Sequence, residues 1–282
     1  MKSICLKTNN SQVLEYLKNE LENIDLDNIC YSYKNFRHYQ NIIIHYTGKE
    51  DEIFINKLST LLSFLVIYEL EENFLKHIIY KNYFYFNSYE RSLILDNCFN
   101  VMVDSKKFLR NKFNVLFTLF KNYLLVHRNI FLTGVITFKF GKYFEILNCI
   151  VDDAVNNFII EKEYYEFISL MKLYVNSQKS KSDIVHIIYS KNYTLLLDND
   201  KQIIEKSSNA FNAKFLSDIS FSENDYTLNT ILELLPKKIY IHLIDNIADE
   251  FINTLNLIFE KRIVLCNDCN ICNLYKKINI KK

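Results

Sequence analysis

A strand–helix–strand pattern in residues 236–266 constrains the fold more than any other stretch of the chain. Pro236 ends a preceding helix, and the β-branched and aromatic runs 238–243 and 262–266 are typical of strands. Between the two runs, apolar residues recur at helical spacing: Ile247, Phe251, Leu255 and Ile258. This order predicts a βαβ unit, in which the two strands are parallel neighbours joined by a right-handed crossover.

Three cysteines follow directly on the second of these strands, as two overlapping CxxC steps: Cys266, Cys269 and Cys272. A structural zinc site takes four nitrogen or sulfur ligands, so three cysteines need a fourth partner. If the two strands are parallel neighbours, His242 lies near Cys266 at the carboxyl edge of the sheet, where open α/β sheets place ligand sites. The sequence therefore predicts a candidate zinc site, although His242 is equally compatible with an ordinary hydrogen-bonded strand residue.

Three interpretations of the cysteine cluster stay open: a metal site, a thiol-redox CxxC, and a turn whose cysteines bind nothing. A zinc ribbon would show a second, separated CxxC pair, and this sequence has none. A redox CxxC is favoured at the N-terminus of a helix, and the few residues after Cys272 argue against a helix there. The other cysteines stand singly in apolar surroundings and are interpreted as buried small residues: Cys5, Cys30, Cys98 and Cys149.

Scarce glycine excludes the common phosphate-binding and nucleophile motifs, because each needs two or more glycines at short fixed spacing. The chain has only Gly48, Gly134 and Gly141, and its histidines form no HExxH motif. One acidic run is typical of a solvated helix face rather than of an acid/base pair: Asp152, Asp153, Glu161, Glu163 and Glu166. We therefore name no catalytic residue, and we favour the interpretation that the protein is not an enzyme.

Charge and hydropathy favour a cytoplasmic protein. Lys and Arg number 34 against 33 Asp and Glu, so the net charge of +1 gives no global field to attract nucleic acid. Two local basic clusters would have to align on one face to bind it: Lys106, Lys107, Arg110 and Lys112, and Lys276, Lys277, Lys281 and Lys282. The N-terminus lacks a signal-peptide core, and the apolar stretches are too short or too interrupted for a span of about 20 residues. We expect no membrane span and no nucleic-acid partner.

The periodicity predicts an α+β fold with three parts. Residues 1–48 form a small N-terminal α/β unit, residues 49–180 are mostly helical, and residues 181–282 form an α/β unit with a mixed sheet that ends in the CxxCxxC cluster. Within the helical part, Gly134 marks an extended stretch over 135–140.

Two segments of this chain resemble the YtxC-like family of sporulation proteins of endospore-forming bacteria. The first comprises Ile136-Thr137-Phe138-Lys139-Phe140, Tyr143 and Ile159 to Phe167. The second runs from Pro236 to His242 and continues, after a helix, through Val264-Leu265-Cys266 to Cys269 and Cys272. The resemblance covers about residues 129–272. It implies a sporulation-associated cytoplasmic protein of unassigned biochemical activity, with no catalytic residues to carry over.

The favoured hypothesis is thus a structural or interaction protein with a protein partner in sporulation and a C-terminal cysteine-rich zinc site. The alternatives are a thiol-dependent redox protein that uses the CxxC steps and a weak nucleic-acid-binding protein.

Overall fold

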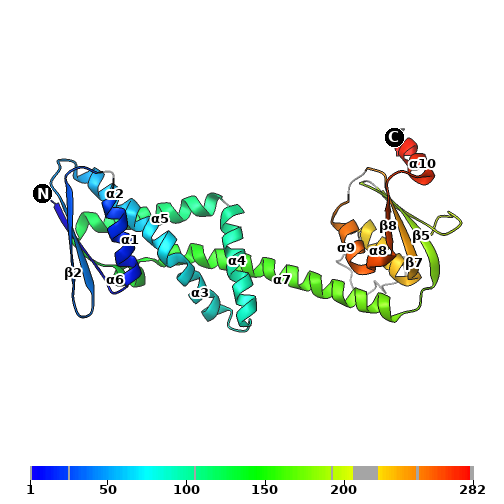
Figure 1. The fold of residues 1–282 in the computed structure, drawn as a ribbon, viewed down its shortest axis with the longest axis horizontal. Coiled ribbons are helices and arrows are strands. Elements are labelled where there is room, and N and C mark those ends of the chain that lie inside the picture. Colours follow the sequence, from blue (N-terminus) through cyan, green and yellow to red (C-terminus); the bar gives the residue numbers. More distant parts are fainter. Residues whose placement is uncertain are drawn as a thin grey trace. The chain divides into compact units, whose positions relative to one another are not determined.

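The protein, in a computed structural model, folds into two compact units, Met1–Ile160 and Glu161–Lys282 (Figure 1). The structure describes residues 2–24, 26–104, 106–191, 193–205, 222–245 and 248–279. The α+β class, the helical middle and the C-terminal sheet with its cysteine cluster are confirmed. The finer division at residues 48 and 180 stays a prediction.

The N-terminal unit begins with a four-stranded sheet of order β2-β3-β1-β4. Strands β1–β3 and β2–β3 pair antiparallel, and β1–β4 pair parallel. The strands are β1 (Lys2–Thr8), β2 (Ile29–Asn35), β3 (Gln40–Tyr46) and β4 (Asn129–Phe131). Helix α1 (Ser11–Glu22) packs its apolar stripe on this sheet, and the Asn10 side chain caps it by accepting from the Gln12 N–H at 2.9 Å.

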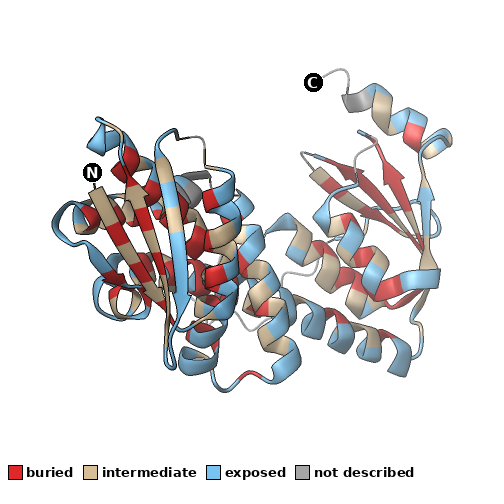
Figure 2. Cartoon of the chain, turned by 60° about the vertical axis from the view of Figure 1, so that its left-hand side comes forward, coloured by how far each residue is buried: buried red, intermediate tan, exposed pale blue. Residues whose placement is uncertain are grey.

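Helices complete the N-terminal unit. They are α2 (Asp51–Leu65), a π-helical turn (Val66–Leu70), α3 (Glu71–Asn82), α4 (Ser88–Asp104), α5 (Lys106–Val126), α6 (Leu132–Lys139) and the first part of α7 (Gly141–Ser177), whose remainder belongs to the C-terminal unit. The stretch Asp51–Asn82 is long and apolar enough to cross a membrane, but half of its most apolar window is buried inside the protein. Figure 2 shows buried residues on the inward sides of these helices.

The prediction of an extended stretch over 135–140 is wrong, because α6 includes all of these residues except the last. Gly134 has no positive φ and lies within the helix, so it does not break it. Leu132 and Val135, three residues apart, are both buried on one side of α6. Tertiary packing of this stripe thus overrides the β-preference of the local sequence.

A charged cluster is buried in the N-terminal unit. The Lys112 ammonium lies 2.6 Å from a Glu71 carboxylate oxygen and 3.0 Å from the Met102 sulfur, and the Tyr143 hydroxyl donates to the other Glu71 oxygen. Lys112 and Glu71 side chains are 1% and 5% exposed. The π-helical turn ends just before this glutamate, whose N–H donates to the Val66 carbonyl five residues back.

The C-terminal unit is a four-stranded sheet of order β6-β5-β7-β8, in which β5, β7 and β8 run parallel. Its strands are β5 (Ser182–Ser190), β6 (Tyr193–Leu197), β7 (Pro236–Leu243) and β8 (Ile263–Cys266). Its helices are α8 (Glu223–Leu234), α9 (Glu250–Phe259) and α10 (Asn270–Asn279), with a 3₁₀ turn at Glu260–Arg262.

The two faces of this sheet are covered differently. One face packs against α8, α9 and the end of α7 in the main core of the unit. On the other face, Ile188 and Leu197 form a smaller cluster with Ile271 and Tyr275 of α10. Residues of β7 alternate between these faces, so the odd-numbered Ile239 and Ile241 enter the main core while His242 faces the opposite side. Because α10 approaches this second face, the cysteines near its start come close to His242.

Candidate metal centre

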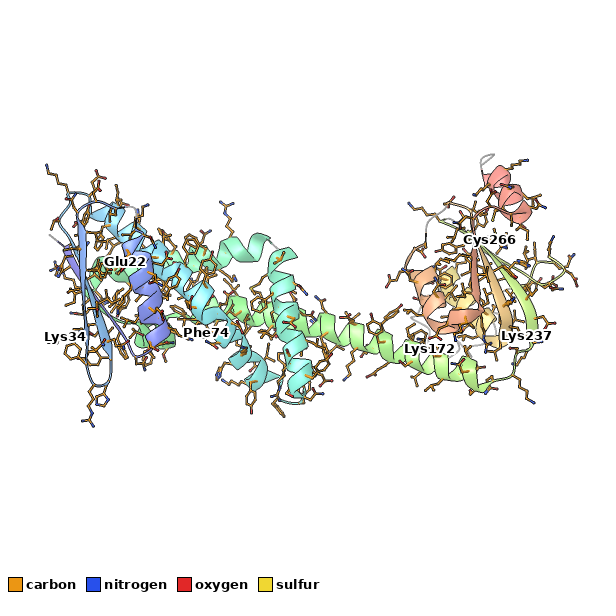
Figure 3. The ribbon with its side chains drawn as sticks, viewed as in Figure 1. Glu22, Lys34, Phe74, Lys172, Lys237 and Cys266 are labelled. Carbon is orange, nitrogen blue, oxygen red and sulfur yellow. The ribbon has the colours of Figure 1, made fainter. Side chains whose placement is uncertain are left out.

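The register of two parallel strands places His242 and Cys266 side by side. Strands β7 and β8 pair parallel with His242 opposite Cys266, as the βαβ pattern predicted. Cys266 is the last residue of β8 (Figure 3), and the chain turns there toward α10. His242 is only 2% exposed, because α10 and the cysteine turn cover it.

The other two cysteines belong to the start of α10. Cys269 immediately precedes the helix, and its sulfur accepts from the Cys272 N–H at 3.5 Å, as an N-cap side chain does. Cys272 lies in the first turn and is fully buried. The expectation that too few residues remain for a helix after Cys272 is therefore wrong: apolar Ile271 and Tyr275, four residues apart, anchor α10 on the sheet.

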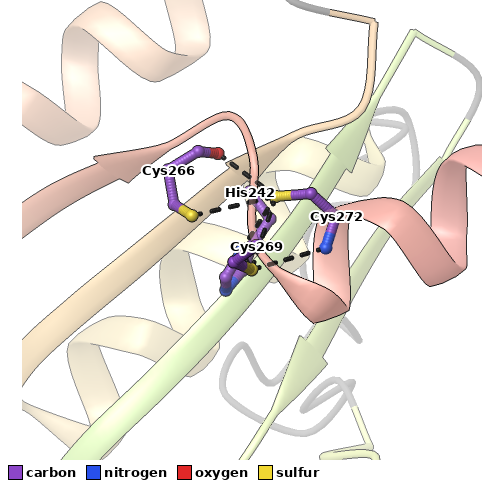
Figure 4. Close-up of side chains that lie close together, drawn as sticks. All are labelled: His242, Cys266, Cys269 and Cys272. Carbon is purple, nitrogen blue, oxygen red and sulfur yellow. Dashed lines mark hydrogen bonds between the residues drawn. The ribbon is translucent and has the colours of Figure 1, made fainter.

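The four candidate ligand atoms form a compact cluster, all within 4.8 Å of one another (Figure 4). The Cys272 sulfur lies 3.7 Å from that of Cys269 and 3.8 Å from that of Cys266. The Nδ1 of His242 lies 3.3 Å from the Cys272 sulfur and 3.4 Å from the Cys269 sulfur.

Four of the six separations among these ligand atoms are close to those found in a tetrahedral zinc site. With zinc–sulfur bonds of about 2.3 Å and zinc–nitrogen bonds of about 2.0–2.1 Å, tetrahedral angles separate two sulfurs by about 3.8 Å and a sulfur from a nitrogen by about 3.6 Å. The measured sulfur–sulfur separations agree closely, and the sulfur–nitrogen separations are a few tenths of an ångström shorter. The four residues could therefore hold a metal ion.

His242 is already in the protonation state that binds a metal, whereas the cysteine thiols would have to lose their protons first. Burial, together with the neighbouring His186, lowers the pKa of His242 to about 4, so its ring is neutral and has a free lone pair at pH 7. Burial and the adjacent thiols raise the pKa of Cys272 to about 11. Burial also opposes ionisation of Cys269, but hydrogen bonds from the Cys272 and Ile271 backbone and from the other two thiols outweigh it and lower its pKa. A bound cation would displace the remaining thiol protons.

One residue of this site was missed at the sequence level. The Nδ1 of His186, on β5, lies 3.0 Å from the Nε2 of His242, and the two rings stack with centroids 5.3 Å apart. The alternation of side chains along β5 could have revealed this residue. The β5–β7 register pairs Ile188 with His242, and His186 lies two residues before Ile188, so its side chain is on the same face of the sheet. Using that signal requires the register, which single-strand patterns do not give.

The isolated cysteines behave less uniformly than expected. Cys98 is buried and Cys5 is partly buried, but Cys30 and Cys149 are exposed. The prediction that all four are buried is thus wrong for these two, because Cys30 lies on β2 at the edge of its sheet and Cys149 lies on the outer side of α7.

The acidic and basic clusters noted in the sequence form no binding site among the described residues; their members lie at the surface or, for Lys112, in the core. The acidic residues of α7 are exposed, as expected for a solvated helix face. Lys112 does not belong to a basic surface, because it is buried against Glu71. Lys281 and Lys282, and the side chains of Lys106 and Lys107, lie outside the described residues.

Comparison with known proteins identifies the family. The model of the YtxC-like family matches residues 56–264, well over half of the chain. The chain belongs to the YtxC-like family. The match begins earlier than the resemblance near residue 129 suggested, and it includes His186 and His242 but ends two residues before Cys266.

A curated relative supports this assignment. "Uncharacterized protein YtxC" of Bacillus subtilis (strain 168) is 22% identical over 128 residues, which cover 45% of this chain and 44% of the relative. The match thus spans less than half the length of that relative. No solved structure matches this chain.

Proposed function

We propose that this is a non-enzymatic interaction protein whose C-terminal unit is held together by a structural zinc ion bound by His242, Cys266, Cys269 and Cys272. The observation that carries the proposal is the compact cluster of their ligand atoms, in which four of the six separations come close to the edges of a zinc tetrahedron. Four protein ligands close the coordination sphere, whereas catalytic zinc keeps one position for water or substrate. A structural role fits this closed set.

The zinc ion would attach α10 to the sheet. Helices as short as the ten residues of α10 are unstable alone in water. Structural zinc contributes about 10–16 kcal/mol to the folding of zinc-finger peptides at pH 7. Ligands on β7, β8 and α10 would therefore make the position of this helix depend on the metal.

The wider role that we propose is in the cytoplasm during sporulation, with a protein partner and without a membrane span. Membership of the YtxC-like family and the resemblance of the chain to its sporulation proteins support this proposal. The absence of glycine-rich and HExxH motifs from the sequence supports a binding role over catalysis.

Elemental analysis of protein purified under reducing conditions tests the zinc site. We expect about one zinc per chain in the wild type, its loss in Cys269→Ser, and its retention in Cys149→Ser. Cys149 is an exposed cysteine of the N-terminal unit, so its variant controls for the loss of a thiol as such. A wild-type protein without metal after incubation with zinc would refute the proposal.

A thiol-redox function is the second candidate, and the start of α10 favours it. Cys269 occupies the N-cap of that helix with a lowered pKa, and the Cys272 sulfur lies 3.7 Å away. This function predicts that iodoacetamide alkylates Cys269 faster than the exposed Cys149 in metal-free protein. Equal alkylation rates would remove it.

A further inference from the structure

We propose that His186 is a positioning residue of the metal centre, which orients His242 by accepting a hydrogen bond from its Nε2–H. The inference rests on the zinc site proposed above. It adds a partner outside the four ligands, and it fixes which nitrogen of each ring carries a proton.

The orientation of His242 decides which of its nitrogens can bind a metal. Its Nδ1 faces the cysteines, at 3.3 Å from the Cys272 sulfur and 3.4 Å from the Cys269 sulfur. Its Nε2 points the other way, to the Nδ1 of His186 at 3.0 Å. A metal among the sulfurs would therefore be bound through Nδ1, and Nε2 would carry the proton.

The proton on Nε2 of His242 needs an acceptor, because the ring is almost completely buried. His186 can accept only through a nitrogen that has a free lone pair, so its Nδ1 is unprotonated and its own proton is on Nε2. Histidine ligands of metals almost always donate their second N–H to an acceptor, most often a carboxylate, a backbone carbonyl or water, and this hydrogen bond orients the ring and increases its basicity. The Nδ1 of His186 would be the acceptor here.

The backbone and the neighbouring rings hold His186 in this position. The β5–β7 register places His186 opposite Tyr240, and its ring stacks on that of Tyr240 at 5.3 Å and 22° as well as on that of His242. These contacts restrict the orientation of the His186 ring. The acceptor is thus in place before a metal binds, which lowers the entropy cost of ordering the ligand.

Two substitutions of similar shape separate hydrogen bonding from packing. Asparagine can place its side-chain oxygen where Nδ1 of His186 lies, whereas leucine places a methyl group there. His77→Leu, at an exposed histidine of the N-terminal unit, is the control. The measurement is the zinc affinity of each variant in competition with a chromophoric chelator, together with the unfolding midpoint of the zinc-free forms.

We expect His186→Leu to weaken zinc binding about 10–100-fold, and His186→Asn and His77→Leu to stay within a few-fold of the wild type. In the zinc-loaded wild type, long-range proton–nitrogen NMR of labelled histidines should show metal on Nδ1 of His242 and a proton on Nε2 of His186. Equal affinity of His186→Leu and the wild type, or a protonated Nδ1 on His186, would overturn the inference while leaving the zinc site intact. A wild type that binds no zinc would overturn both.

Discussion

The buried Lys112–Glu71 pair predicts an unusual pattern of mutant stabilities. The two side chains are 1% and 5% exposed, their charged atoms lie 2.6 Å apart, and the Tyr143 hydroxyl satisfies the second carboxylate oxygen. Replacement of either charged residue leaves the other buried without its counter-charge. Such a loss costs about 3–5 kcal/mol, which is a large part of the roughly 5–15 kcal/mol by which a typical domain is stable.

The two single variants are Lys112→Met and Glu71→Gln, and the double variant combines them. Each single change should lower the free energy of unfolding by about 3–5 kcal/mol. In the double variant no charge stays buried, and the glutamine oxygen can still accept from Tyr143. We therefore expect the double variant to be more stable than either single variant, with a coupling energy of several kcal/mol.

Urea unfolding followed by far-UV circular dichroism measures these energies. Tyr143→Phe supplies a milder reference, because it removes one hydrogen bond but keeps the ion pair; its expected cost is about 1–3 kcal/mol. If the double variant loses the sum of the two single losses, or if the single variants lose less than about 1 kcal/mol, then the pair is not a coupled buried ion pair and the reasoning is refuted.

Two further predictions concern pH and metal. Burial and the hydrogen bond to Asp249 raise the pKa of Tyr189 to about 12, against about 10 in an unfolded chain, so between these values the folded state holds the proton that the unfolded state loses. This contribution to stability is complete below pH 10 and is lost as the pH rises further. The melting temperature of the wild type should therefore fall more steeply from pH 10 to 12 than that of Tyr189→Phe. If the melting temperatures of the two proteins fell in parallel with pH, this prediction would be contradicted. For the metal, chelation of zinc should release α10 and accelerate tryptic cleavage after Lys276 and Lys277, as Cys269→Ser should without chelator. Cleavage of equal rate with and without zinc would show that the metal does not hold this helix.

The sequence was sufficient for elements whose pattern is local. The βαβ unit was readable because strand and helix periodicities alternate clearly around Pro236, and its parallel pairing then placed His242 beside Cys266. The cysteine spacing pointed to the rest of the site. Each of these steps uses residues within about one supersecondary unit.

The features that were missed depend on contacts between distant segments. His186 meets His242 across 56 positions, and Lys112 meets Glu71 across 41. Neither pairing leaves a trace in the spacing of residues along one element. Helix α6 was mistaken for an extended stretch for the same reason, since burial against the rest of the unit decides its conformation.

In the π-helical turn between α2 and α3, the number of residues is more important than the identity of each residue. In this turn the Glu71 N–H donates to the Val66 carbonyl five residues back instead of four. A three-base deletion that removes one codon between Val66 and Leu70 would keep the reading frame, yet it would abolish this spacing in the segment that leads directly into Glu71, the partner of Lys112. Tyr68, in the middle of the turn, is 68% exposed, and its ring stacks on that of Phe64 at the surface, so a substitution there would remove only this contact and leave the turn in place. The gene for this chain should therefore tolerate substitutions at Tyr68 far better than any change in the number of codons around it.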